Sequence, residues 1–268
     1  FLKHKSAFLF GTPYPYVATR RTSSHYTNHI LMKLFLKIGR TLRHIYYAPV
    51  QVFLYLTQRK DMATFLRLRS QWKECADRLT SADTQPTKTP LWEDFNHSIY
   101  QALSPIPPWY FLRKKVFQQT MVVVKHGKLL AEQLRFLRAH YTARQLRHLL
   151  REHIVGFPLI CSWGYLSSHN TIHTLYHWAR FQNHTSYNLS SPHIIEWGGG
   201  YGNMCRVLWK YHHGNFRYWI VDTPLMISVQ WLYLASIYGT EQVSIASESS
   251  EPPTSKIVLV PTTHLHLL

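Results

Sequence analysis

The sequence predicts an α/β protein whose C-terminal part forms a Rossmann-like parallel sheet. Two short apolar runs, residues 194–197 and 218–222, are each followed by a predicted helix, at 203–212 and 224–238, and the first of these helices has apolar residues at helical spacing. A glycine-rich turn separates the first run from its helix. Parallel strands need crossover connections, which are usually helices, so this alternation predicts a doubly wound sheet.

The third strand of this sheet has two candidates. The apolar run 257–260 is the preferred one, and 243–246 is the alternative. An open sheet of this kind is not complete with three strands. We therefore expect the domain to be truncated, with its C-terminal half beyond Leu268.

Mainly helical sequence precedes the sheet. Apolar periodicity and helix-stop residues predict helices at about 29–44, 49–79 and 92–103, one or two within 111–153 that break near Gly127, and one from Ser167 or Ser168 to about Phe181. A polar stretch with two prolines, 80–90, is predicted to be a linker. The chain is therefore divided into a basic helical N-terminal region with its linker (1–90), a second helical region (91–185) and the truncated Rossmann-like domain (186–268).

The net positive charge of the protein comes from the first part of the chain. The net charge is +17, and residues 1–150 contain 24 Lys or Arg against 7 Asp or Glu, whereas residues 151–268 contain 6 of each kind. A basic region suggests an anionic partner such as nucleic acid, a membrane surface or a charged substrate. A helical region with a solvated basic face explains the same charge equally well.

The segment 29–44 illustrates these alternatives. Its cationic positions fall on one helix face, and its apolar residues form a broad face around the rest. Such a helix can lie on an anionic membrane, but packing of the apolar face against a neighbouring helix is favoured. The cationic positions are Lys33, Lys37, Arg40 and His44.

Cellular location is predicted from what the sequence lacks. No segment has the roughly 20 apolar residues of a membrane span, and the N-terminus has no apolar signal-peptide core. Cys75, Cys161 and Cys205 show no CxxC spacing, so neither a disulfide framework nor a zinc motif is predicted. We expect a cytoplasmic protein, with peripheral contact to the inner membrane surface through the basic N-terminal region as an alternative.

Three histidines recur at four-residue steps along one predicted helix, at His169, His173 and His177. Histidines on one helix edge can bind a metal. No acid or cysteine nearby completes a ligand set, so no metal site is predicted.

The glycine-rich turn carries the chemistry. Glu196 ends the first strand, and Gly198, Gly200 and Gly202 follow at alternate positions. Glycines let the backbone pass close to a ligand, and the N-terminus of the next helix offers free N–H groups. Asp222 ends the second strand, where an acid can accept both hydroxyl hydrogens of a ribose. A nucleotide-like ligand is therefore predicted at the carboxyl ends of the strands.

The spacing and charge of the turn narrow the choice of ligand. A dinucleotide site has the pattern G-x-G-x-x-G, but Asn203 occupies the third glycine position when the pattern starts at Gly198. The carboxylate of Glu196 beside the turn would repel a pyrophosphate and attract a cation. S-adenosylmethionine (SAM), which has an ammonium, a sulfonium and a ribose, is therefore favoured over NAD.

These residues also carry a resemblance. Ile194-Ile195-Glu196-Trp197-Gly198-Gly199-Gly200-Tyr201-Gly202, followed by Tyr218-Trp219-Ile220-Val221-Asp222-Thr223-Pro224, resembles the class I SAM-dependent methyltransferases. More narrowly, it is similar to a family of sugar O-methyltransferases, whose pattern is close to V-E-I-G-G-G-Y-G followed by Y-x-I-V-D-L-P. The resemblance covers roughly residues 150–268 and is specific around 194–224.

The resemblance implies roles for individual residues. Glu196, Gly198, Gly200 and Gly202 would line the methionine end of SAM, Asp222 would hold the ribose, and Pro261 or Thr262 would lie near the adenine. Trp197 departs from the family pattern, which has a small aliphatic residue there. The fourth strand, whose end should supply substrate and catalytic groups, is missing, so no catalytic base is named.

The predicted function is SAM-dependent O-methylation of a sugar hydroxyl on a glycan or glycan precursor. The sugar acceptor rests on the resemblance alone. A basic RNA methyltransferase is the alternative that the charged first part of the chain suggests. A second alternative is a non-catalytic membrane-surface or scaffold module with a vestigial SAM fold.

Overall fold

The computed structural model describes residues 48–81, 90–122, 127–185, 192–247 and 254–267. All of them belong to one compact unit, Tyr47–Leu268, and the other unit is Phe1–Tyr46. The predicted basic helix at 29–44 and most of the predicted linker therefore lie outside the described residues. The boundaries predicted at 90 and 185 fall within this compact unit, and the division of the chain at these positions stays a prediction.

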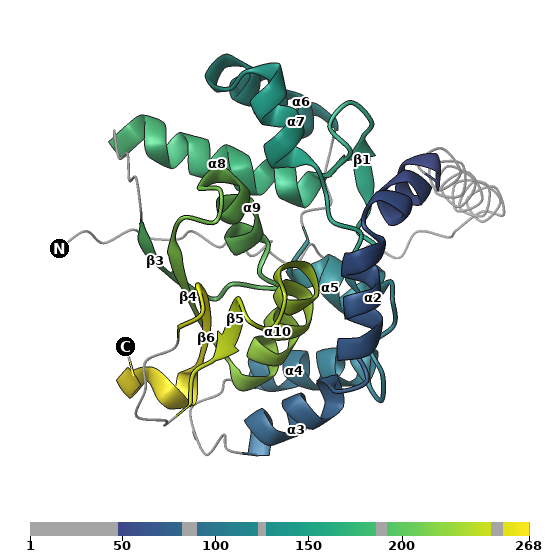
Figure 1. Cartoon of the computed structure of the whole chain (residues 1–268), viewed down its shortest axis with the longest axis vertical. Coiled ribbons are helices and arrows are strands. Elements are labelled where there is room, and N and C mark those ends of the chain that lie inside the picture. Colours follow the sequence, from purple (N-terminus) through teal and green to yellow (C-terminus); the bar gives the residue numbers. More distant parts are fainter. Residues whose placement is uncertain (1–47, 82–89, 123–126, 186–191, 248–253, 268) are drawn as a thin grey trace, which may run out of the picture. The chain divides into compact units, whose positions relative to one another are not determined.

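A four-stranded parallel sheet forms in the C-terminal part of the chain, as the alternation of strands and helices predicts. Its order is β3-β4-β6-β5, and Figure 1 shows the four strands side by side. The bounds are β3 His193–Trp197, β4 Arg217–Asp222, β5 Val243–Ile245 and β6 Ile257–Pro261. Both candidates for the third strand are strands, and β6 lies between β4 and β5.

Two helices connect these strands and cover one face of the sheet. Helix α9 (Asn203–Tyr211) follows β3, and α10 (Pro224–Tyr238) follows β4. Inward-facing strand residues such as Ile220 and Leu259 share the main apolar core with buried residues of both helices. Pro224 at the first position suits the start of α10, because its missing N–H would be unpaired there in any case.

The opposite face of the sheet has a smaller apolar cluster. Val221, Val258 and Val260 form it together with Ala246, next to the short helix η2 (Thr262–Leu267). Towards the edge strand β3, Ile195 and Trp197 are 63% and 68% exposed. A doubly wound sheet would have helices over both faces. In the described part of the chain, α9 and α10 cover a single face, so only the mixed α/β class with its parallel sheet is confirmed.

Helices precede the sheet, as predicted, but they are shorter and more numerous. The stretch predicted at 49–79 is helical at 48–57 and in α2 and α3, with breaks around 58 and 69–71, and the stretch 111–153 divides into four short helices. The bounds are α2 Arg59–Leu68, α3 Trp72–Ser81, α4 Pro90–Leu103, η1 Phe111–Arg113, α5 Lys115–Thr120, α6 Gly127–His140, α7 Ala143–Leu150 and α8 His169–Thr185.

Helix α8 begins where the sequence predicts it. The Oγ atom of Ser168 accepts a hydrogen bond from the backbone N–H of Thr171 at 3.2 Å, which is the capping contact expected of a serine. A two-stranded hairpin, β1 (Ile160–Ser162) and β2 (Ser167–Ser168), lies just before it and was not predicted. Its strands are too short to show an alternating pattern.

Helix α10 lies between the sheet and the helical region. It contacts β4, β5 and β6 as well as α2 and α3, and its residues are buried nearly all round. This double contact makes the helical region and the sheet one packed body. None of the helices in the described residues is both long and apolar enough to cross a membrane.

Candidate functional site

The glycine turn forms a tight loop between β3 and α9. Gly198, Gly200 and Gly202 all have positive φ, at 76°, 56° and 92°. The backbone N–H of Gly198 donates to Val221 O at 2.9 Å, so the loop leaves the sheet in register with β4. Residues other than glycine rarely adopt these left-handed backbone angles, which explains the glycines at alternate positions.

The glycines differ in what surrounds them. A Cβ atom at Gly199 would lie 2.5 Å from Ile220 Cγ2, and one at Gly202 would lie 2.9 Å from Leu234 Cδ1. These two positions need glycine for packing. A Cβ at Gly198 would meet nothing within 4 Å, and one at Gly200 would only approach Met121 at 3.9 Å. The loop is therefore open at Gly198 and Gly200, where a ligand could approach the backbone.

Glu196 lies beneath this loop at the end of β3. Its Oε2 accepts a hydrogen bond from the hydroxyl of Tyr218 at 3.0 Å. Burial raises the pKa of Glu196 to about 7; the Tyr218 hydrogen bond opposes the rise, and the nearby Asp222 adds to it. A cation placed beside Glu196 would favour its ionised form and lower this pKa.

Asp222 is bound to the loop itself. The side-chain amide Nε2 of Gln230 donates to Asp222 Oδ2 at 2.8 Å, and the backbone N–H of Thr223 donates to Oδ1 at 2.8 Å. Burial raises the pKa of Asp222 to about 6, against hydrogen bonds from Thr223, Gln230 and the backbone N–H groups of Gly199 and Gly200. The two acids of the site are therefore both partly buried, and both have raised pKa values.

Gln230 was not predicted as a site residue. Besides its bond to Asp222, its Nε2 donates to the carbonyl oxygen of Gly200 at 3.0 Å, so it joins the second acid to the loop. It lies within the apolar run of α10, and a polar residue in such a run was the only signal in the sequence. Its Oε1 and the hydroxyl of Thr223 are buried without a hydrogen-bond partner among the described residues.

The remaining predicted positions lie at the same edge of the sheet. Pro261 pairs in register with Asp222, and Thr262 follows it at the start of η2. Because β3, β4 and β6 are parallel neighbours, their carboxyl ends meet there. The structure thus brings together the glycine loop, both acids and the end of β6.

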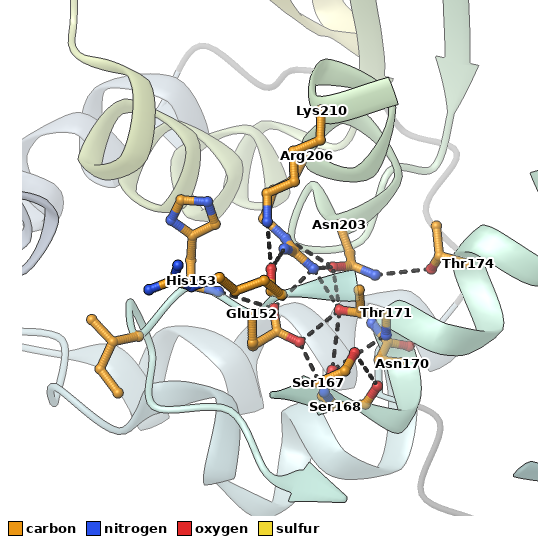
Figure 2. Close-up of polar contacts among 12 residues, drawn as sticks. Glu152, His153, Ser167, Ser168, Asn170, Thr171, Thr174, Asn203, Arg206 and Lys210 are labelled. Atoms are coloured by element: carbon orange, nitrogen blue, oxygen red, sulfur yellow. Dashed lines mark hydrogen bonds and ion pairs between the residues drawn. The ribbon is translucent and has the colours of Figure 1, made fainter. Parts of the chain in front are cut away.

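Residues from the helical region also reach the glycine loop. Asn170 Nδ2 of α8 donates to the hydroxyl of Tyr201 at 2.8 Å, and Asn203 Nδ2 donates to Thr174 Oγ1 of α8 at 2.8 Å. Figure 2 shows Asn170 and Thr174 on α8 with Asn203 facing them. The sequence gave no indication of these contacts, because the partners lie about thirty residues apart in the chain.

The three histidines of α8 contact one another and α6. His173 Nδ1 lies 2.7 Å from Gln133 Nε2, and His173 Nε2 lies 3.0 Å from His177 Nε2. Burial and the neighbouring histidines lower the pKa of His173 to about 4. Among the described residues, no group of three or more His, Cys, Asp or Glu side chains has an arrangement that could hold a metal ion.

A cavity of about 530 Å³ lies at the other end of α9 from the glycine loop. Its walls include Gln145, His148, Lys210 and His213, and none of the predicted site residues contributes to it. Burial and the nearby Arg206 lower the pKa of Lys210 to about 7. This cavity is separate from the edge where the strands end.

Comparison with known proteins adds no assignment. No protein-family model matches the chain. A search of curated proteins finds no match at the significance required. The function is therefore argued from the residues of the site.

Proposed function

We propose that this chain is part of a SAM-dependent O-methyltransferase that binds its cofactor at the glycine loop. The observation that carries the proposal is the placement of two partly buried carboxylates, Glu196 and Asp222, beside a loop of left-handed glycines at the carboxyl edge of a parallel sheet. A class I Rossmann-like fold is the finer fold assignment that goes with it.

The residues present fit SAM in three respects. The loop is open at Gly198 and Gly200, where no side chain fills the space that a ligand needs. Glu196 offers a carboxylate for a cationic ammonium group. The partnerless Gln230 Oε1 beside Asp222 can accept a hydrogen bond from a ligand hydroxyl or amine.

Each residue has a positioning role in this proposal. Glu196 and the loop backbone hold the methionine end, Asp222 accepts hydrogen bonds from the ribose hydroxyls, and Pro261 and Thr262 lie near the adenine. Because Asp222 already accepts bonds from Gln230 and Thr223, ribose hydroxyls would compete with Gln230 for the carboxylate. The side chain of Gln230 would then rearrange when the cofactor binds.

When bound, SAM supplies an electrophilic methyl group for in-line transfer to a hydroxyl oxygen. A base would take the proton of the acceptor hydroxyl. No described residue is assigned as this base. The proposed acceptor is a sugar hydroxyl of a glycan or a sugar-containing small molecule.

Calorimetry with S-adenosylhomocysteine, the demethylated product, tests cofactor binding. Wild type should bind, and Asp222→Ala should bind at least tenfold more weakly, because a buried charge-assisted hydrogen-bond acceptor is lost. Asp94→Ala is the matched control, since Asp94 is exposed on α4. No binding by wild type, or equal binding by wild type and Asp222→Ala, would contradict the proposal.

The basic first part of the chain supports RNA as a second candidate acceptor. Its excess of 24 Lys or Arg over 7 Asp or Glu in residues 1–150 is the observation in favour. Phosphate contacts make binding steeply salt-dependent. Binding of a generic RNA that weakens sharply between low and high salt would favour RNA over a sugar; no binding at low salt would exclude it.

The location of the protein is also a proposal. A cytoplasmic enzyme is favoured, with contact between the basic N-terminal region and the inner membrane surface as the alternative. Flotation of the full chain with anionic and with neutral vesicles distinguishes the two, because electrostatic attachment requires the anionic lipid.

A further inference from the structure

Helix α8, which lies outside the predicted Rossmann-like domain, makes two direct side-chain contacts with the candidate cofactor loop. Asn170 donates to the hydroxyl of Tyr201 within the loop, and Thr174 accepts from Asn203, the first residue of α9. Tyr201 is 2% exposed and Asn203 is 5% exposed, so water does not compete with these bonds. Both contacts hold the segment from which the loop amides project.

A buried ion pair holds α8 and α9 in place behind these contacts. Arg206 Nη2 lies 2.8 Å from Glu152 Oε1, and the two side chains are 0% and 1% exposed. Glu152 Oε2 also accepts the hydroxyl of Thr171 of α8 at 2.6 Å. Figure 2 shows the carboxylate between Arg206 on α9 and the start of α8. One acid therefore joins the first turns of both helices.

The same arginine fixes the orientation of Asn203. Its Nη2 donates to Asn203 Oδ1 at 2.8 Å and its Nε donates to the same oxygen at 3.2 Å. With the oxygen occupied in this way, the amide nitrogen of Asn203 faces Thr174. The contact between α8 and the start of α9 thus has a single favoured arrangement.

Such a cluster fixes geometry more than it adds stability. A buried ion pair is seldom more stabilising than apolar side chains of the same volume, because both charges lose their hydration. Its hydrogen bonds are directional, however, and the carboxylate accepts from Ser168, Thr171, Arg206 and the backbone of His153. Directional contacts next to a loop that must keep left-handed angles point to a positioning role.

We propose that α8 is part of the cofactor site, with Asn170 and Thr174 as positioning residues that hold the glycine loop in its binding conformation. The inference rests on the proposed function, since it names residues that act on the same cofactor. It extends the site to residues that precede the sheet by about twenty positions.

The chain provides a matched pair of variants for the test. Tyr201→Phe removes the hydroxyl group that accepts from Asn170 at 2.8 Å. Tyr211→Phe removes the hydroxyl group that accepts from Gln182 at 2.9 Å. Both bonds join a side-chain amide of α8 to a tyrosine near one end of α9. Tyr201 lies in the loop before α9, whereas Tyr211 is the last residue of α9 and lies far from the loop. Thr174→Val, which keeps the side-chain shape, is the second loop-side variant.

The dissociation constant for S-adenosylhomocysteine and the thermal midpoint are measured for each variant. Tyr201→Phe and Thr174→Val should weaken binding by roughly two- to tenfold, the effect of losing one buried hydrogen bond. Tyr211→Phe should bind S-adenosylhomocysteine within about twofold of wild type, although its thermal midpoint should fall as much as those of the two loop-side variants. A purely structural role predicts no such difference, so equal affinities in all three variants would overturn the inference.

Hydrogen exchange at the amides of Gly199 to Asn203 separates this inference from the proposed function. The amides should exchange faster in Tyr201→Phe than in Tyr211→Phe, with or without a ligand. If wild type does not bind S-adenosylhomocysteine, the proposed function fails, and the exchange rates alone decide whether α8 positions the loop. Equal exchange in the two variants would overturn the inference even if the cofactor binds.

Discussion

The side-chain amide of Gln230 donates to Asp222 at 2.8 Å and to the carbonyl oxygen of Gly200 at 3.0 Å. A single buried glutamine thus connects the end of β4 to the glycine loop. The bond also favours the ionised form of Asp222, against burial that raises its pKa to about 6.

Replacing Gln230 should therefore affect both stability and titration. Gln230→Met keeps the volume but removes the donor, so the free energy of unfolding should fall by about 1–3 kcal/mol. The pKa of Asp222 should rise further, because its carboxylate loses a hydrogen bond. Urea unfolding at neutral pH and carbon NMR titration measure the two effects. Gln101→Met, at an exposed position of α4, should change neither.

Breaking the ion pair between Glu152 and Arg206 should cost far more than breaking a surface pair. Removing one partner leaves a buried charge uncompensated, so Glu152→Gln or Arg206→Met should lower the free energy of unfolding by about 3–5 kcal/mol. Replacing both partners should cost less than the sum of the two. The exposed pair Lys73–Asp77 is the control, and Lys73→Gln should cost much less than either of these changes.

The ion pair between Glu152 and Arg206 should also make the stability of the protein depend on pH. Burial alone would raise the pKa of Glu152, but Arg206, Ser168 and Thr171 outweigh it and hold the pKa below its ordinary value of 4.5. The resulting stabilisation is present above that value and is lost as pH falls through the lower folded pKa. Unfolding midpoints measured from pH 6 downwards should fall less steeply in Glu152→Gln, which has no carboxyl group to titrate at this position. An equal slope would show that other acids account for the effect.

Cofactor affinity should depend on pH through Glu196. Its pKa of about 7 in the free protein means that a cationic ligand must displace a proton below that pH. Affinity for S-adenosylhomocysteine, whose amine is cationic, should rise from pH 5 to about 7 and then level off. Calorimetry in buffers of different ionisation enthalpy measures the released proton. Glu196→Gln should remove most of this slope and leave the part due to Asp222 below its pKa of about 6.

Stability of the free protein should change in the opposite direction over this range. The folded pKa of Glu196 is raised above its ordinary value of 4.5, so the folded state favours the protonated acid. Its contribution to stability is full below that value and is lost as pH rises to about 7. The same Glu196→Gln variant should be less sensitive to pH between these limits; unchanged sensitivity would contradict the assignment.

The glycines of the loop should differ in their tolerance of alanine. Gly202→Ala combines a φ of 92° with a 2.9 Å approach to Leu234, so it should lower stability by about 2–4 kcal/mol. Gly200→Ala has strain but no clash and should cost about 1–2 kcal/mol. Gly164→Ala, with no atom within 4 Å and no positive φ, is the control and should stay within about 0.5 kcal/mol. Equal losses at all three positions would show that neither factor matters.

The elements of the sheet domain could be predicted from the sequence because their signals are local. Helix α10 runs from Pro224 to Tyr238, the bounds predicted from the sequence, and a proline suits its first position. The glycines of the loop are also a local signal, because each of them provides the positive φ that its own position requires. The end of a parallel strand is enough to place Asp222 at the ligand edge.

The tertiary structure decided what depends on residues far apart in the chain. The insertion of β6 between β4 and β5 could not be predicted, because either apolar run could pair with β4. Burial raises the pKa values of Glu196 and Asp222, and this burial exists only in the folded chain. Both acids are visible in the sequence, but their protonation depends on what surrounds them.

The sequence by itself determined the order of strand, acid, glycine loop and helix, since each step follows from nearby residues. Only the tertiary structure placed Asn170 of α8 against Tyr201 and paired Glu152 with Arg206. The physical reason is that a hydrogen bond or ion pair between distant segments leaves no periodic pattern in either of them. The glycine loop could therefore be found from its own residues, whereas the side chains that hold it in place could not.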